Sequence, residues 1–197
     1  MISVNPLTEV RLSHRAYHIA GWQSGHVAAV SRQGAGSILA PNHTQCTEFR
    51  LPAEATDLAL SANGDLISIS AGGEVILVST ATLRPLKRLE DSLEGCQFGK
   101  SGELWCIARL DENSVAVDLR EPETWRVVAR TEITDPFGNS FFKIHSHPDG
   151  EHVVIWAAAG QDGQCLFWAR RDGSQIRVDR FIDLDATTPP SFSSSGD

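Results

Sequence analysis

A tight turn built around glycine recurs along this 197-residue chain and constrains its fold more than any other feature. The best-preserved copy contains Asp149 and Gly150 and lies between two apolar runs, so it predicts a β-hairpin. The marker glycines of the related turns stand 39, 38, 48 and 46 residues apart, at Gly25, Gly64, Gly102, Gly150 and Gly196. A period of about 40 to 50 residues, made of short strands, is typical of β-propeller blades, each a four-stranded antiparallel sheet.

Each interval between marker glycines divides into apolar runs of strand length. No window of twelve or more residues keeps the three-to-four-residue spacing of an amphipathic helix, so the chain is predicted to be all-β. The expected strands are 27–31, 37–40 and 44–50 in the first unit, 56–60, 66–70, 74–79 and 85–89 in the second, 95–98, 104–110, 114–118 and 125–132 in the third, and 141–145, 152–158, 164–170 and 175–181 in the fourth.

The hydrophobic pattern within a unit predicts sheets that stack face to face. Second strands such as Val153–Ala157 are apolar at every residue, as a strand buried on both faces must be. Fourth strands such as 175–181 alternate polar and apolar residues, which suits an outer edge that meets water. We therefore expect buried second strands and exposed fourth strands.

Two stretches of the fourth unit carry a family resemblance. The run from Phe142 to Gly150 is similar to the first-strand phrase of WD40-type β-propeller blades, and the run from Gly160 to Trp168 resembles their turn and third strand. The resemblance covers roughly residues 16–197. The Trp-Asp pair that ends the family's third strands is not kept, and Gly25-His26 lies in the wrong turn. The resemblance therefore implies a divergent WD40-type propeller without the family's Asp-His-Ser-Trp hydrogen-bond network.

The repeats divide the chain into four blades and two flanking segments. The blades are expected at about residues 16–51, 52–91, 92–135 and 136–185. Residues 1–15 are expected to form an N-terminal segment that could supply a closing strand. Residues 186–197 are either the start of a fifth blade or a disordered tail after a four-bladed ring. We favour the first interpretation, in which the chain is a fragment of a longer propeller.

Composition and charge argue against several classes of protein. The net charge of −8 disfavours general binding to DNA or RNA, which requires a basic field. Apolar runs such as Val153–Ala159 are far shorter than the roughly 20 residues that span a bilayer, so no membrane association is expected. Residues 1–21 contain no continuous apolar segment of the secretory type, and a cytoplasmic location is therefore expected.

The four cysteines are widely spread and form no Cys-x-x-Cys pair, so free thiols are expected at Cys46, Cys96, Cys106 and Cys165. Cys96 and Cys106 fall at mirrored positions of one predicted hairpin and could be neighbours. The favoured interpretation is that the cysteines pack as small buried apolar residues.

Three histidines form the sharpest metal-ligand candidate. His145 and His147 stand two apart on a predicted strand, and His152 lies across the hairpin. Asp149 could add an oxygen ligand. The same residues also suit an ordinary polar turn, so no metal is predicted at His145, His147 and His152, and no cofactor is predicted for the chain.

No catalytic constellation emerges from the sequence. The chain has neither a Gly-x-Ser-x-Gly nucleophile elbow nor a phosphate-binding P-loop. The carboxylate pairs are expected in solvated loops, at Glu90 and Asp91, Asp111 and Glu112, and Asp183 and Asp185. Of the five tryptophans, Trp22 and Trp125 lie nearest to loops and are candidates for partner contacts, since tryptophan is enriched at binding hot spots.

A non-catalytic scaffold for an unidentified protein partner is therefore the predicted function, and the oligomeric state is left open. One alternative is a propeller enzyme, a hydrolase or oxidoreductase, with its site on the central channel. That alternative predicts that polar groups from several first strands converge, with Asp57, Lys143 and His145 as candidates. Another alternative is a regulatory domain of a larger signalling protein.

Overall fold

The computed structural model describes residues 12–21, 25–40, 46–51, 54–138, 140–147, 149–160 and 163–184. Every regular element in these residues is a β-strand, and the strands form four antiparallel sheets of four. The predicted all-β fold is confirmed. The described part of the chain contains no helix that is long and apolar enough to cross a membrane.

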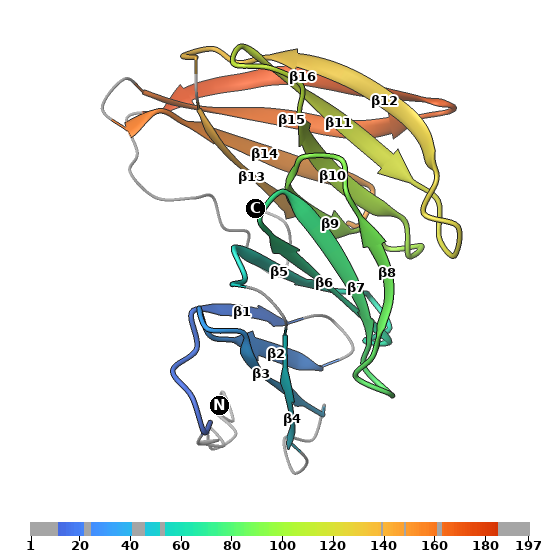
Figure 1. Cartoon of the computed structure of the whole chain (residues 1–197). Helices are drawn as coiled ribbons and strands as arrows, with labels where there is room; N and C mark the ends of the chain where they lie inside the picture. Colours follow the sequence, from blue (N-terminus) through green and yellow to red (C-terminus); the bar gives the residue numbers. More distant parts are fainter. Residues whose placement is uncertain are drawn as a thin grey trace, which may run out of the picture.

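Each sheet is one blade whose strands lie side by side in chain order (Figure 1). Blade 1 contains β1 (His18–Gly21), β2 (Val27–Val30), β3 (Ala35–Leu39) and β4 (Cys46–Arg50). Blade 2 contains β5 (Asp57–Leu60), β6 (Leu66–Ala71), β7 (Glu74–Ser79) and β8 (Pro85–Leu89). Blade 3 contains β9 (Leu93–Phe98), β10 (Leu104–Arg109), β11 (Ser114–Arg120) and β12 (Val127–Thr134). Blade 4 contains β13 (Phe141–Ser146), β14 (His152–Ala158), β15 (Gln164–Asp172) and β16 (Gln175–Leu184).

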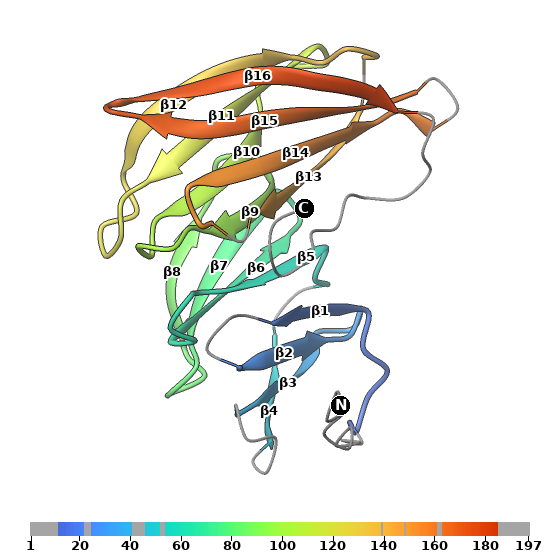
Figure 2. The same ribbon diagram turned by 180° about the vertical axis from the view of Figure 1, so that it is seen from behind.

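The blades follow one another as in a β-propeller, with their first strands adjacent. Strand β1 packs beside β5, β5 beside β9, and β9 beside β13. Figures 1 and 2 show blade 1 and blade 4 at opposite ends of this series. The predicted closing segment and the predicted fifth blade fall largely on residues 1–11 and 185–197, which lie outside the described residues.

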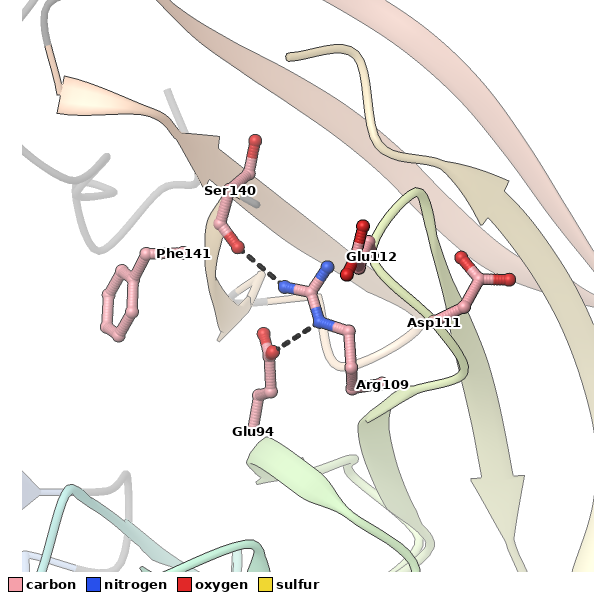
Figure 3. Close-up of a pocket in the computed structure, with 6 residues that line it drawn as sticks. All are labelled: Glu94, Arg109, Asp111, Glu112, Ser140 and Phe141. Atoms are coloured by element: carbon pink, nitrogen blue, oxygen red, sulfur yellow. Dashed lines mark hydrogen bonds and ion pairs between the residues drawn. The ribbon is translucent and has the colours of Figure 1, made fainter. Parts of the chain in front are cut away.

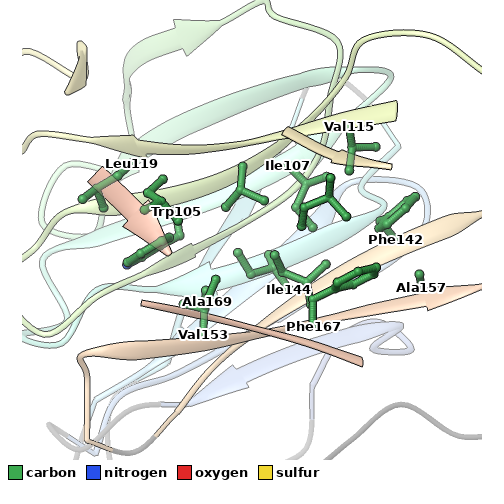
Figure 4. Close-up of a cluster of buried hydrophobic side chains, with 14 of the residues drawn as sticks. Trp105, Ile107, Val115, Leu119, Phe142, Ile144, Val153, Ala157, Phe167 and Ala169 are labelled. Carbon is green, nitrogen blue, oxygen red and sulfur yellow. The ribbon is translucent and has the colours of Figure 1, made fainter. Parts of the chain in front are cut away.

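Three apolar clusters form the core, and each one lies between two neighbouring blades. Strand β7 shows how this arises, because Val75 and Leu77 belong to the cluster shared with blade 3, while Ile76 and Val78 belong to the cluster shared with blade 1. The third cluster joins blades 3 and 4, where Trp105 of β10 faces side chains of β13 to β15 (Figure 4). Successive side chains of an apolar strand point to opposite faces of its sheet. One strand therefore contributes apolar side chains to the clusters on both sides of its blade.

The burial of the strands confirms the predicted gradient from inner to outer positions. Second strands such as β6 and β14 are buried along nearly their whole length, whereas β4 and β8 are largely exposed. Several strands differ from the prediction, and two of the differences are large. Strand β1 was not predicted, and β16 continues to Leu184, so that Asp183 pairs with Cys165 in the sheet instead of lying in a loop. The apolar residues Phe181, Ile182 and Leu184 favour this extension of the strand.

Candidate functional site

The up-and-down blades place their turns at two ends of the molecule. We call the end with the marker glycines the marker-turn end, and it carries the turns from first to second strands and from third to fourth strands. The opposite end carries the turns from second to third strands and the connections between blades. Gly64, Gly102 and Gly150 all have φ between 72° and 83°, the left-handed region that glycine adopts without steric cost.

A groove of about 470 Å³ opens at the marker-turn end between blades 2 and 3. Leu86 of the outer strand β8 forms one side and is 58% exposed. Trp125, in the β11–β12 turn, lies deeper in the groove and is only 8% exposed. The lining residues are Ser61, Asn63, Leu66, Leu86, Lys87, Ser101, Gly102, Pro122, Glu123 and Trp125. The groove thus combines an apolar floor with one acidic and one basic side chain.

A strained turn holds Trp125 in this position. Glu123 and Trp125 have φ values of 66° and 59°, a conformation that costs a residue with a β-carbon of the order of 1 kcal/mol or more. The Trp125 N–H donates to the carbonyl of Glu121 at 3.1 Å, and Arg120 Nη1 donates to the Trp125 carbonyl at 3.2 Å. The indole meets the ring of Phe98 edge to face, with the ring centroids 6.3 Å apart. Trp125, predicted as a contact residue, therefore lies in the groove, whereas Trp22 is outside the described residues.

A buried ion network in blade 3 supports the same turn. Asp118 has no exposed surface, and Arg130 donates to its two carboxylate oxygens from Nε at 2.6 Å and from Nη2 at 2.7 Å. Arg120, which holds the Trp125 carbonyl, also contacts Asp118 at 3.4 Å and forms an ion pair with Asp91. Although burial alone would lower the pKa of Arg120, the hydrogen bond and charge of Asp91 raise it. Arg120 therefore stays charged and ties the groove to the blade.

A second cavity, of about 580 Å³, opens at the opposite end between blades 3 and 4 (Figure 3). Arg109 lies in it and donates from Nε to Glu94 at 2.7 Å and from Nη2 to the Ser140 carbonyl at 2.6 Å. Its Nη1 reaches Asp135 at 3.3 Å. Burial would lower the pKa of Arg109, but these carboxylates raise it. The Arg109 guanidinium therefore links Glu94 of blade 3 to Asp135 and to Ser140, which directly precedes blade 4. The lining residues are Glu94, Arg109, Asp111, Glu112, Ser140 and Phe141.

Polar groups on three of the first strands influence one another electrostatically, and they include Asp57, Lys143 and His145, the candidates of the enzyme alternative. Burial, together with the charge of Lys143, lowers the pKa of His145 to about 4. Burial raises the pKa of Asp57 although Lys143 opposes the shift. His18 of β1, which the sequence analysis did not single out, also belongs to this group. Burial lowers the pKa of His18, and the charge of Asp57 partly opposes this shift. Perturbed titratable groups of this kind mark candidate functional positions.

The three candidate metal ligands do not form one group. Strand β13 ends at Ser146, so the alternation that was expected to align His145 with His147 stops before His147. His147 and His152 do lie together, and Asp149 takes the third place in the group. His145 belongs instead to the first-strand group, and its Nε2 atom is buried with no hydrogen-bond partner.

Three of the four cysteines are buried as predicted, whereas the prediction is wrong for Cys46, which is exposed. Cys96 and Cys106 are opposite each other in the β9–β10 pair, as the hairpin predicted, and both are free and buried. Burial raises the pKa of Cys96 to about 12 and that of Cys106 well above its usual value, which makes both thiols poor nucleophiles. Trp105 is buried in the core, and Trp156 donates from Nε1 to Gln164 at 2.9 Å.

No protein-family model matches the chain, and no curated protein sequence matches it either. Among solved structures, the chain is similar to the β-propeller domain of Cps50 (Swd1) from Myceliophteria thermophila, with a TM-score of 0.62 and 14% identity over 96% of this chain and 62% of that one. It is also similar to Kluyveromyces lactis Hsv2, with a TM-score of 0.57 and 10% identity over 89% of this chain and 64% of that one.

A third similar structure is the dihydro-heme d1 dehydrogenase NirN in complex with DHE, with a TM-score of 0.55 and 11% identity over 86% of this chain and 36% of that one. The chain thus spans between about a third and two thirds of the length of these structures. At such low identities the likeness establishes the fold alone. Together with the four sequential blades, it shows that the chain has the fold of a β-propeller, as the resemblance to WD40-type blades implied.

Proposed function

We propose that this propeller is a non-catalytic scaffold that binds a protein partner through the groove between blades 2 and 3. The observation that carries the proposal is the pairing of exposed Leu86 with Trp125, which a strained and hydrogen-bonded turn holds in the same groove. Tryptophan is enriched among the few residues that dominate the binding energy of protein interfaces. Leu86 supplies exposed apolar surface in the same groove, which a partner can cover. The opposite charges of Lys87 and Glu123 at the groove would orient the bound partner.

Rigidity supports this assignment as well. The turn that carries Trp125 is tied by Arg120 to the buried carboxylate of Asp118, so little conformational freedom is left to lose on binding. The outer strand β8 is exposed along most of its length and begins with Pro85, which discourages non-specific pairing of the sheet edge. The groove can therefore bind side chains of a partner without a change in its own conformation.

A pair of matched variants tests the proposal. Leu86→Asp places a charge in the groove, and Leu110→Asp places the same charge on an exposed leucine at the opposite end. Partners captured by the wild-type chain from cell extract are identified and purified, and their affinities are then measured for all three proteins. We expect Leu86→Asp to weaken binding at least tenfold, which is about 1.4 kcal/mol, and Leu110→Asp to leave it unchanged.

Equal affinities of the wild-type chain and Leu86→Asp for every captured partner would overturn the assignment of the groove. Failure of the wild-type chain to retain any protein would overturn the scaffold function itself. Equal thermal unfolding of the two variants shows that a loss of binding does not arise from misfolding.

The enzyme alternative has its own support in the first-strand group of His18, Asp57, Lys143 and His145. One of the similar structures is named as a dehydrogenase, although that likeness extends to the fold only. A small molecule that shifts the NMR signals of His18 and His145, and is turned over by the protein, would favour this alternative over the scaffold.

A further inference from the structure

The β13–β14 turn brings two imidazoles to one carboxylate oxygen. His147 Nδ1 lies 3.0 Å from Asp149 Oδ2, and His152 Nδ1 lies 2.6 Å from the same oxygen. The three potential ligand atoms lie within 4.8 Å of one another. The side chains of His147, Asp149 and His152 are 13%, 37% and 21% exposed, so solvent reaches the group without surrounding it.

Backbone hydrogen bonds fix the spacing of these three residues. The His147 N–H donates to the His152 carbonyl at 3.0 Å, and the Gly150 N–H donates to the His147 carbonyl at 2.9 Å. Asp149 Oδ1 accepts from the N–H groups of Glu151 at 2.8 Å and His152 at 3.1 Å. One carboxylate oxygen therefore holds the turn, and the other is directed toward the imidazoles.

A carboxylate oxygen beside two imidazole nitrogens is a ligand set that suits divalent transition metals.

His147 Nδ1 and Asp149 Oδ2 face each other at 3.0 Å. The Asp149 N–H lies 3.3 Å from the same nitrogen and donates to its lone pair. A neutral imidazole with its lone pair on Nδ1 is the form that binds a metal ion, and here that lone pair lies beside a carboxylate oxygen.

We propose that His147, Asp149 and His152 form a binding site for one divalent transition-metal ion of the class that favours imidazole, such as Zn²⁺ or Ni²⁺. Three protein ligands within one short turn leave coordination positions for water or for a group of a bound molecule. The site lies at the marker-turn end, the same end as the groove between blades 2 and 3.

The structure supplies an internal reporter for this site. The indole of Trp168 on β15 lies with its ring centroid 5.1 Å from that of His147 and 5.2 Å from that of His152. A paramagnetic ion such as Ni²⁺ bound by these histidines would stand close enough to quench the fluorescence of Trp168.

The test is a titration of the metal-free, untagged full chain with NiCl₂ and separately with ZnCl₂. Tryptophan fluorescence follows the nickel titration, calorimetry follows both, and elemental analysis after gel filtration counts the bound ions. We expect saturable binding of one ion per chain, with quenching by nickel. Trp168→Phe should bind equally but lose most of the quenching.

Variants locate the site. His147→Gln and His152→Gln should each weaken binding at least tenfold, and Asp149→Asn should weaken it while its Oδ1 still holds the turn. His145→Gln, which alters a histidine outside the group, should bind as the wild type does. Absence of saturable binding to the wild-type chain, or unchanged affinity in both His147→Gln and His152→Gln, would overturn the proposal. Circular dichroism of each variant verifies that the fold is kept.

Discussion

Gly150 lies so close to Lys100 of the preceding blade that a β-carbon added to Gly150 would stand only 2.3 Å from the Lys100 β-carbon. The Lys100 N–H also faces the Gly150 carbonyl at 3.4 Å. Gly64 has the same relationship to His26 of blade 1, where an added β-carbon would lie 2.4 Å from Nδ1. Gly64 and Gly150, two of the marker glycines that reveal the repeat, are therefore also points where the turns of neighbouring blades touch.

Gly150→Ala is expected to destabilise the protein more than Gly173→Ala. Both glycines have positive φ, at 72° and 62°, so alanine at either position costs about 1–2 kcal/mol in backbone strain. Only Gly150 faces a neighbour that cannot move away, whereas no atom lies within 4 Å of a β-carbon added at Gly173. Overpacking should add about 1–3 kcal/mol at Gly150. Urea unfolding measures the difference, and equal losses in the two variants would contradict this account.

Asp118→Ala is expected to cost about 1–3 kcal/mol of stability, because it removes the buried carboxylate that accepts from Arg130 and contacts Arg120, although Asp91 still pairs with Arg120. The exposed pair of Arg32 and Glu54 supplies the control, since Glu54→Ala should cost less than about 1 kcal/mol. Chemical denaturation of both variants checks the contrast. A loss at Asp118 as small as that at Glu54 would mean that the network does not support blade 3.

Lys143→Met is expected to raise the pKa of His145. In the wild-type chain the folded-state pKa of about 4 lies below the usual 6.5, so the native state holds fewer protons than the unfolded state. The contribution of His145 to stability is therefore complete above pH 6.5 and is lost as the pH falls toward 4. Removal of the Lys143 charge should move the pKa upward, though burial keeps it below 6.5.

An NMR titration of the His145 ring protons measures this shift directly. It distinguishes the titration of His145 from the titrations of Asp57 and His18, whose pKa values are also affected by Lys143 and by each other. Lys100→Met serves as the control, because Lys100 is not among the groups that perturb His145. An unchanged His145 pKa in Lys143→Met would show that the two side chains do not interact.

Thiol labelling of the native chain is expected to modify Cys46 alone. Cys46 is exposed, whereas Cys96, Cys106 and Cys165 are buried. One thiol per chain should react rapidly with Ellman's reagent before unfolding, and four should react in denaturant. Cys46→Ser should remove the rapid reaction. Rapid reaction of two or more thiols in the native protein would contradict the burial of Cys96 and Cys106.

Much of the fold could be predicted from the sequence, because turn glycines and strands that are apolar on both faces have direct sequence signatures. Strand β1 was missed because His18–Gly21 is short and has no apolar pattern. The start of β12 was placed too early because the positive φ of Trp125, which ends the preceding turn, has no sequence signal in a residue other than glycine.

The candidate sites were harder to predict, since they depend on how blades rotate against one another. Trp125 could be chosen for its residue type and its place beside a loop. Leu86 could not, because its approach to Trp125 joins two blades whose relative orientation the sequence does not specify. Asp149 replaced His145 in the histidine group because β13 ends one residue before His147, and strand ends are difficult to locate from local patterns.

The order of the strands has a consequence for the way in which this protein is made. Within the described residues, each sheet consists of four consecutive strands, and each apolar cluster joins blades that are neighbours in the chain. Each of these four blades can therefore form from a continuous segment and dock on the blade that emerged from the ribosome just before it. Synthesis from the N-terminus would build the propeller one blade at a time, with each finished face serving as the template for the next.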